Sequence, residues 1–531
     1  RNPGSVLVAL RHSYADDSHE RAIAASLRSA RPDLEVVTSA DVLPEIREYE
    51  RFATASAEAY ARPAVIRYLD GLAARLAAAD QPAPAVMTSG GGMQPAAVAA
   101  RHAAALALSG PAGGVVGAAA VLAALAELSA SSTPASRSSR SVNAANAALA
   151  SSADARAAGL LDALTIDIGG TSADAGLILD GEPLVESGGE VAGVPIALPR
   201  VLVDTVSAGG GSIAWIDDGG ALRVGPRSAG AKPGPVAFGR GGTEPTVTDA
   251  QLVLGRIAAR AMSGGVALDV DAARAAVGAL AARLGSDVER TAAAILRIAD
   301  AEMARALRRV SVERGVDPRR CTLIAFGGGG PLHACALADA LAMPRILVPP
   351  FAGVLSAVGL ALAPERREAA MSVMASAASM TREALAISVH RLSEKAEGRE
   401  RRTFARMRYR GQGHELEIPV YAAAENATSA SGRDDSPVGA DDGPALAKRF
   451  AEAHAKRYGF TLPSEVEIVA LRHEAGEPAR RVAFAAAPAH APGGRINGPH
   501  TLALSDATLF IAEGWVATPL PIGGWLLERA R

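Results

Sequence analysis

The sequence predicts an α/β protein whose C-terminal part is an α+β module. Three patterns indicate this class. Residues 5–38 read as strand, helix and strand, which is the order of a βαβ unit. Strand-like runs at residues 85–88 and 322–326 lead through glycine clusters into helix-like runs. Beyond residue 364 the glycine clusters stop, and helix and strand patterns alternate toward the C-terminus.

The composition is that of an ordinary globular protein and argues against several classes. The 531 residues suffice for about two to four domains, and 49% of them are hydrophobic and 21% charged. A net charge of −2 gives no indication of a nucleic-acid surface. Two cysteines are too few for a disulfide scaffold, which favours a reducing, cytoplasmic setting. The longest apolar run, residues 113–126, is expected to be too short to cross a membrane, and no signal peptide is visible.

The N-terminal part is expected to contain a strand at residues 5–10, a helix at 18–30 and a strand at 34–38. Residues 44–51, Pro-Glu-Ile-Arg-Glu-Tyr-Glu-Arg, then begin a helical stretch that reaches about residue 76. Charges at this spacing are typical of a solvated helix face with i, i+4 ion pairs, and a role in substrate binding is the alternative.

Glycine clusters recur ahead of helix-like runs, at residues 89–92, 109–114 and 327–330. Such a loop directs backbone N–H groups and a helix dipole toward one point, as anion sites do. The glycines of the last cluster are therefore candidate nucleotide-binding residues: Gly327, Gly328, Gly329 and Gly330. Pro331 then suits the first turn of a helix, in which His333 is either a buried structural group or a direct ligand.

Residues 164–178 carry the clearest chemistry, because two strand-like runs are joined there by Asp-Ile-Gly-Gly-Thr-Ser-Ala-Asp. Glycines let backbone N–H groups approach an anion, and hydroxyls add donors, so the phosphate-binding candidates are Gly169, Gly170, Thr171 and Ser172. The carboxylates of Asp167 and Asp174 suit a hydrated Mg²⁺ that bridges phosphates. The alternative is a glycine-rich β-hairpin whose aspartates cap turns. No lysine follows a glycine loop, so a P-loop with its lysine is absent.

Two further glycine-rich loops, residues 203–212 and 239–249, contain charged side chains. Asp204 and Asp249 are catalytic candidates there, because functional residues concentrate on loops, although both loops also fit irregular structure in an insertion. Residues 129–158 and 423–444 lack periodicity and are rich in small and polar residues, so we expect two disordered surface insertions.

These motifs, in this order, resemble the hydantoinase A/5-oxoprolinase family, which is related to the ATP-using subunits of acetone and acetophenone carboxylases. The likeness is carried by residues 109–114, 167–174, 205–214, 228–230, 233–235, 239–249, 326–334, 348–350, 353–357, 409–412, 458–459 and 513–515. Family members begin with an Asp-x-Gly-Gly-Thr-x-Thr-Asp loop that this chain does not show, so we expect an N-terminally incomplete member. The chain also has Ala173, Ser207 and Ala237 where Thr, Gly and Cys are usual in the family.

The resemblance implies an actin/hexokinase/Hsp70-like ATPase fold, in which two ribonuclease-H-like lobes enclose ATP. Residues 1–62 would be the remainder of the N-terminal lobe, residues 63–364 the hydantoinase/oxoprolinase core, and residues 365–531 the C-terminal α+β module. The loop at residues 167–174 would bind phosphate, and residues 327–330 would lie near the adenosine. The resemblance also implies a hydantoinase B-type partner chain and an oligomer.

We therefore expect an ATP- and Mg²⁺-dependent subunit that opens 5-oxoproline or hydantoin rings through a phosphorylated amide. Phosphoryl transfer needs positioning and charge neutralisation, which backbone-lined loops and carboxylates supply. One alternative is the ATP-using subunit of a ketone carboxylase. The other is a truncated, non-catalytic paralogue that binds a partner, and the absent first phosphate loop favours it.

Overall fold

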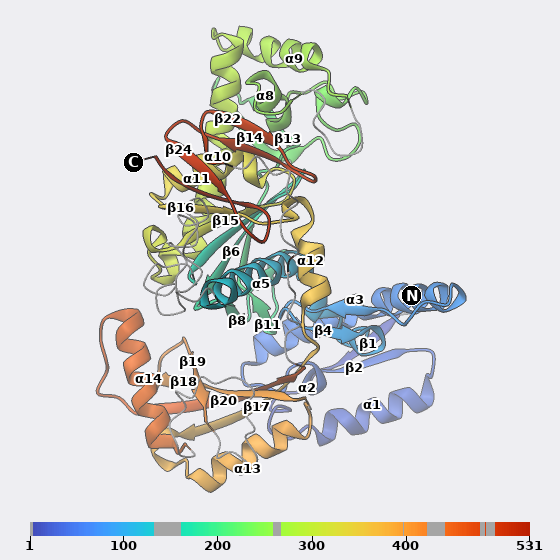
Figure 1. Cartoon of the computed structure of the whole chain (residues 1–531). Coiled ribbons are helices and arrows are strands. Elements are labelled where there is room, and N and C mark those ends of the chain that lie inside the picture. The colour runs from blue at the N-terminus through green and yellow to red at the C-terminus, as the bar shows by residue number, and fades with distance from the viewer. Residues whose placement is uncertain are drawn as a thin grey trace. The chain divides into compact units, whose positions relative to one another are not determined.

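The computed structural model describes residues 4–131, 161–258, 267–396, 398–421, 441–477, 484 and 494–530 (Figure 1). The chain forms two compact units. Unit 1 comprises Arg1–Ser109, Glu186–Arg200 and Pro364–Arg480, and unit 2 comprises Gly110–Val185, Val201–Ala363 and Arg481–Arg531. Apart from residues 129–131 and 441–444, the two expected insertions lie outside the described residues.

Unit 2 is built on one mixed sheet with the strand order β12-β6-β5-β15-β16-β25-β24-β21, with β7 paired to β6 (Figure 1). The strands are β5 Ala163–Ile168, β6 Ala173–Leu179, β7 Glu182–Pro183, β12 Val203–Val206, β15 Thr322–Phe326, β16 Arg345–Val348, β21 Ile496–Asn497, β24 Trp515–Pro519 and β25 Trp525–Arg529. Strands β5, β15 and β16 are parallel to one another, and the remaining pairs are antiparallel. Every residue of the central strand β15 is buried, which explains its continuous apolar sequence.

The helices of unit 2 are α5 Ser109–Ser131, α8 Val247–Val253, α9 Val270–Arg283, α10 Val288–Val310, α11 Gly330–Ala340 and α12 Leu355–Leu362. Helix α10 begins where the Asp287 side chain accepts a hydrogen bond from the Arg290 N–H, and it packs on β6 and β12. Two smaller pairs complete the unit: β13 Ser212–Ile216 with β14 Leu222–Ser228, and β22 His500–Ala503 with β23 Thr508–Ile511.

Helix α5 corrects two expectations. Residues 109–114 form its first turns and not a loop, and the segment Ser109–Leu128, with a mean hydropathy of 1.7, is long and apolar enough to span a membrane. Half of that segment is buried inside the protein, however. A Cβ on Gly359 of α12 would lie 1.8 Å from the Gly113 carbonyl oxygen, so glycines allow the two helix backbones to touch. This close packing is what a core helix of a folded unit requires.

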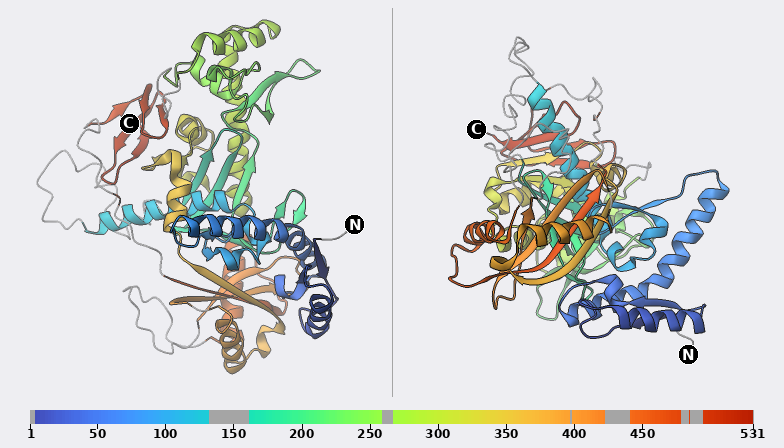
Figure 2. Two further views of the ribbon diagram at one scale, coloured as in Figure 1. Left: turned by 90° about the vertical axis from the view of Figure 1, so that its right-hand side faces the viewer. Right: turned by 90° about the horizontal axis from the view of Figure 1, so that it is seen from below.

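Unit 1 contains the predicted βαβ unit and a four-stranded antiparallel sheet. Strands β1 Ser5–Val8 and β2 Glu35–Thr38 pair in parallel, connected by α1 Ser18–Ala30. The sheet has the order β17-β20-β18-β19, with bounds Arg366–Ser376, Val466–Gly476, Glu400–Tyr409 and Leu416–Val420. Helices α13 Arg382–Ser393 and α14 Gly443–Tyr458 share one hydrophobic core with this sheet (Figure 2).

The remaining helices of residues 1–109 are α2 Ser39–Val42, α3 Glu48–Ala78 and α4 Ala96–Ala99. The glycine cluster at residues 89–92 differs from its prediction, because it closes the hairpin of β3 Ala85–Met87 and β4 Met93–Pro95 and does not lead from a strand into a helix. Four short strands lie at or near residues 186–200: β8 Val185–Ser187, β9 Glu190–Val191, β10 Val194–Pro195 and β11 Pro199–Val201.

The two units cut across the three predicted segments. The α+β character expected after residue 364 is present up to β20, but β25 pairs with β16 in the sheet of unit 2. Residues 63–109 belong to unit 1 instead of sharing a unit with the central glycine motifs. The physical reason is edge pairing: β16 needs a hydrogen-bonding neighbour on its outer side, and β25 from the end of the chain provides it.

Candidate phosphate-binding site

The acidic loop forms the turn of the β5–β6 hairpin in unit 2. In the antiparallel register Asp167 lies directly opposite Asp174, and Ile168 lies opposite Ala173. Side chains that face each other across two strands point to the same face, with Cβ atoms about 4.5–5.5 Å apart. The hairpin therefore holds the two carboxylates side by side at the base of its turn.

Each carboxylate has one hydroxyl donor. Ser356 Oγ, in the first turn of α12, donates to Asp167 Oδ2 at 3.0 Å, and Thr205 Oγ1 donates to Asp174 Oδ1 at 2.6 Å. Burial raises the pKa of both carboxyl groups above their ordinary value, and the charge of Asp167 raises the pKa of Asp174 further. Two desolvated carboxylates that repel each other are stabilised by a cation between them.

The donor set fits Mg²⁺. Among the described residues no group of three or more His, Cys, Asp and Glu side chains is arranged to hold a metal ion. Mg²⁺ does not need such a cage, because it commonly keeps several waters and binds one or two carboxylates together with phosphate oxygens. Asp167 and Asp174 are the residues that can hold it.

The turn between the strands, residues 169–172, is held from one side by a second glycine loop. Gly210 N–H donates to the Gly169 carbonyl at 3.0 Å, and Gly211 N–H donates to the Gly170 carbonyl at 2.6 Å. A Cβ on Gly209 would lie 2.8 Å from the Gly169 oxygen, so a larger residue would force the two loops apart. Gly169, Gly170 and Thr171 are exposed, which leaves the outer side of the turn accessible to an anion.

The tetraglycine segment adjoins the same hairpin. Strand β15 runs parallel to β5 with Phe326 beside Asp167, and the Gly329 N–H donates to the Ile168 carbonyl at 2.9 Å. Gly327 has φ of +78°, and a Cβ there would lie 2.2 Å from Asp167 Oδ1, so both conformation and space require glycine. The acidic loop and the tetraglycine therefore converge, as the sequence predicted.

Not all four backbone N–H groups of residues 327–330 are available to a ligand. Gly327 N–H is bonded to the Ala352 carbonyl at 2.8 Å, in addition to the bond made by Gly329. Gly328 is exposed, and nothing lies within 4 Å of the position its Cβ would take. Gly328 and the start of α11 are thus the part of the segment that a ligand can reach.

Asp204 and Asp249 do not join this cluster. Asp204 alternates with Thr205 along β12, so it points to the opposite face, where it pairs with Arg309 of α10 at 2.8 Å. Asp249 is fully buried and forms a capping box with Thr246 at the start of α8. Its carboxylate also accepts from the Val236 and Ala237 N–H groups. The structure gives Asp249 a structural role in place of the catalytic role considered from the sequence.

His333 also has a structural environment. The ring is buried, its Nδ1 is 2.5 Å from Asp300 Oδ1, and its Nε2 is 3.1 Å from Gln251 Nε2. Both ring nitrogens are therefore occupied by side chains of unit 2. Of the two interpretations of His333, the structure supports the buried structural group and not the direct ligand.

Sequence reasoning missed the residues that support the acidic pair, Ser356 and Thr205. Both lie in segments that carry the family likeness, Thr205 in residues 205–214 and Ser356 in residues 353–357, but neither position has a spacing that predicts contact with the hairpin. Strand register and the return of α12 to the sheet bring them there.

Comparison with known proteins agrees with this geometry. The hydantoinase/oxoprolinase family model matches residues 51–133 and 129–369. An uncharacterized protein of Methanocaldococcus jannaschii is 35% identical over 488 residues, covering 88% of this chain and 64% of its own length. Caprolactamase subunit alpha of Pseudomonas jessenii is 36% identical over 359 residues, covering 67% of this chain and 47% of its own. The chain thus spans about half to two thirds of these relatives.

Solved structures show the same fold. The crystal structure of ATP-dependent caprolactamase from Pseudomonas jessenii matches with a TM-score of 0.77 and 28% identity, covering 99% of this chain and 77% of that one. A nucleotide-free acetone carboxylase structure matches with a TM-score of 0.70 at 22% identity, covering 99% and 76%. A family match over more than half of the chain, together with the hairpin and glycine segments described above, shows that this chain belongs to the hydantoinase/oxoprolinase family.

Proposed function

We propose that this chain is the ATP-using subunit of an enzyme that opens cyclic amides, with 5-oxoproline or a hydantoin as substrate. The observation that carries the proposal is the cross-strand pair Asp167 and Asp174, placed between two glycine segments that reach the same end of the sheet. The ATP-dependent caprolactamase relative supports the cyclic-amide class. The carboxylase relatives support a phosphorylating apparatus that is shared across the family.

The chemistry accounts for this arrangement. A lactam carbonyl is a poor electrophile and its ring nitrogen a poor leaving group. Transfer of the γ-phosphoryl group of ATP to the amide oxygen gives a phosphorylated amide and ADP. Water then attacks the activated carbon, the ring C–N bond breaks, the nitrogen takes up a proton and inorganic phosphate leaves. The protein must position reactants and neutralise charge, which needs no covalent nucleophile.

Each part of the site has a role in this scheme. Residues 169–172 bind phosphate through backbone N–H and hydroxyl groups, and the exposed Gly328 region contacts the nucleotide. Asp167 and Asp174 hold Mg²⁺, which when bound neutralises phosphate charge. Ser356 and Thr205 orient the two carboxylates. Asp204 pairs with Arg309 on the opposite face of β12 and takes no part in the scheme.

The remaining elements of the proposal concern the assembly. We infer an actin/hexokinase/Hsp70-like ATPase in which the sheet of unit 2 belongs to one ribonuclease-H-like lobe. Because relatives are named as subunits, we infer a partner chain, of hydantoinase B type, and an oligomeric enzyme. The low cysteine content supports a cytoplasmic location.

Nucleotide binding is the first test, because a ligand of the folded state raises its stability. ATP with Mg²⁺ is expected to raise the melting temperature of the wild-type chain and of Asp271→Asn, which changes an exposed aspartate of α9. Asp167→Asn is expected to abolish the Mg²⁺-dependent part of the rise. No rise for the wild type would contradict nucleotide binding and support the non-catalytic alternative.

Phosphate release with substrates is the second test, performed with and without the partner chain. Stimulation by 5-oxoproline, hydantoin or caprolactam supports a cyclic amidase. Stimulation only by a ketone with bicarbonate would identify a carboxylase subunit and overturn the proposal.

A further inference from the structure

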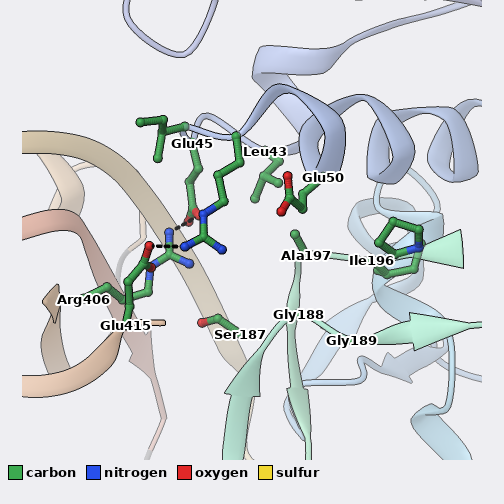
Figure 3. A pocket seen from close by; sticks show the side chains of 13 residues that line it. Leu43, Glu45, Glu50, Ser187, Gly188, Gly189, Ile196, Ala197, Arg406 and Glu415 are labelled. Atoms are coloured by element: carbon green, nitrogen blue, oxygen red, sulfur yellow. Dashed lines mark hydrogen bonds and ion pairs between the residues drawn. The ribbon is translucent and has the colours of Figure 1, made fainter. Parts of the chain in front are cut away.

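A cavity of about 200 Å³ lies within unit 1, at the N-terminal end of helix α3 (Figure 3). Residues of the predicted charged segment 44–51 line it, together with the loop at residues 187–197 and two residues of the C-terminal sheet region, Arg406 and Glu415. The cavity is smaller than the 300–1,000 Å³ of typical drug-sized sites, so it suits a molecule of a few carbon atoms.

Its polar wall departs in part from the expectation of a solvated helix face, because Glu45 is buried while Arg47 is exposed. The Glu45 side chain is only 9% exposed and pairs with Arg406. Arg47 donates through Nη2 to Glu415 Oε1 at 2.7 Å and to the Gly413 carbonyl at 3.0 Å. Burial raises the pKa of Glu45, whereas the Arg47 side chain is 40% exposed, so the polar wall has a buried and a solvent-accessible part.

Two groups of this wall keep unused binding capacity. Within the described part of the chain, the Glu50 carboxylate has no hydrogen bond or ion pair, and Figure 3 shows it beside Ala197. Both side-chain bonds of Arg47 leave from Nη2, so its other guanidinium edge is unbonded. Arg47 also has φ of +86°, a conformation that is strained for a non-glycine residue and that often marks binding sites.

Arg47 is the N-cap residue of α3, Glu50 lies in the first turn of the helix, and both line the cavity. They have opposite charges, yet no ion pair joins them, because Arg47 pairs with Glu415. A simple anion would be repelled by Glu50, and a simple cation would be repelled by Arg47. A ligand that carries both charges would complement both residues.

Apolar side chains also line the cavity: Leu43, Ile46, Pro195 and Ile196. Such a surface accepts methylene groups and gains free energy from their burial. The carbon chain of a small ligand can lie there while its charged ends meet the polar wall.

We propose that this cavity binds a small zwitterion of the amino-acid class, with its carboxylate on Arg47 and its ammonium group on Glu50. The site is separate from the phosphate-binding hairpin of unit 2, and binding there needs no nucleotide. Opening of a lactam leaves an amine and a carboxylate on one molecule, so ring-opened products are suitable probes. The proposal itself does not depend on turnover.

Isothermal titration of the full chain without ATP tests the inference, using L-glutamate, 4-aminobutanoate and 6-aminohexanoate. Hexanoate and hexylamine carry one charge each and are expected to bind at least tenfold more weakly than the best zwitterion. No binding of any zwitterion at millimolar concentration would overturn the proposal, whether or not the chain hydrolyses ATP.

Two variants locate the site. Glu50→Gln removes an unpaired charge and is expected to fold normally and to weaken the best zwitterion about tenfold or more. Hexanoate is expected to bind Glu50→Gln more tightly than wild type, because the repelling carboxylate is gone. Arg47→Gln is expected to weaken both. The matched controls Arg67→Gln and Asp70→Asn change exposed charges farther along α3 and are expected to bind as the wild type does. Unaltered zwitterion binding by Glu50→Gln would refute the assignment, even if Arg47→Gln fails to fold.

Discussion

Replacing Gly327 with alanine is expected to destabilise unit 2 by about 2–5 kcal/mol. A non-glycine residue in the left-handed region costs about 1–2 kcal/mol, and Gly327 has φ of +78°. The added Cβ would also lie 2.2 Å from Asp167 Oδ1 and 2.6 Å from the Ile168 carbonyl oxygen. Both are parts of the buried strand end, and forced overpacking of this kind costs about 1–3 kcal/mol more. The neighbouring Gly328→Ala is the control, because its Cβ would have nothing within 4 Å.

Tryptophan fluorescence during urea unfolding is a suitable assay. The three tryptophans of the chain, Trp215, Trp515 and Trp525, all lie in unit 2, so the signal reports on the unit that contains Gly327. With a urea dependence of about 2–3 kcal/mol per molar, the midpoint of Gly327→Ala is expected about 0.7–2.5 M below wild type. Gly328→Ala is expected to change stability by less than about 0.5 kcal/mol. Equal midpoints for the two variants would refute the close contact between the tetraglycine and Asp167.

Three further changes test other parts of unit 2 with the same fluorescence assay. Asp249→Ala is expected to cost about 2–4 kcal/mol, because it leaves buried N–H groups of the capping box unbonded; retained nucleotide binding would confirm that the role is structural. The folded-state pKa of Asp174 is raised by burial above its ordinary 3.8, so the wild type loses stability as the pH rises through that folded pKa. Asp174→Asn has no carboxyl group to ionise, so the free energy of unfolding of the variant minus that of the wild type should increase as the pH rises through the folded-state pKa. A difference between variant and wild type that does not change from pH 4 to 8 would contradict a buried carboxylate that is repelled by Asp167. Gly359→Ala is expected to lower stability by about 2–4 kcal/mol, because its Cβ would lie 1.8 Å from the Gly113 oxygen. Gly110→Ala on α5 has no neighbour within 4 Å and should be neutral or stabilising by up to about 1 kcal/mol.

Local patterns of the sequence determined the fold class, the βαβ unit at the N-terminus and the chemistry of the hairpin. Alternation and apolar runs are properties of neighbouring residues, so β5, β6, β15 and α10 could be located without coordinates. The convergence of the acidic loop with the tetraglycine was also predictable, because each of the two glycine segments directly follows an apolar, strand-like run.

Prediction from the sequence failed where one local pattern has different roles at different places in the fold. A glycine cluster ahead of a helix predicts an anion site, but at residues 109–114 the glycines allow α5 to pack against α12. A carboxylate in a glycine-rich loop predicts function, but Asp249 caps a helix and bonds buried N–H groups. Sequence shows which groups are present and not which partners will satisfy them.

The sequence by itself determined the residue types at the candidate phosphate site, the loop that presents them and the family to which the chain is similar. Only the tertiary structure decided which carboxylates meet: the register of β5 and β6 pairs Asp167 with Asp174, whereas the alternation of β12 turns Asp204 toward Arg309. Tertiary contacts likewise turned the charged segment at residues 44–51 into a cavity wall. The physical reason is that burial, strand register and long-range pairing depend on residues distant in the chain, whose positions no local pattern encodes.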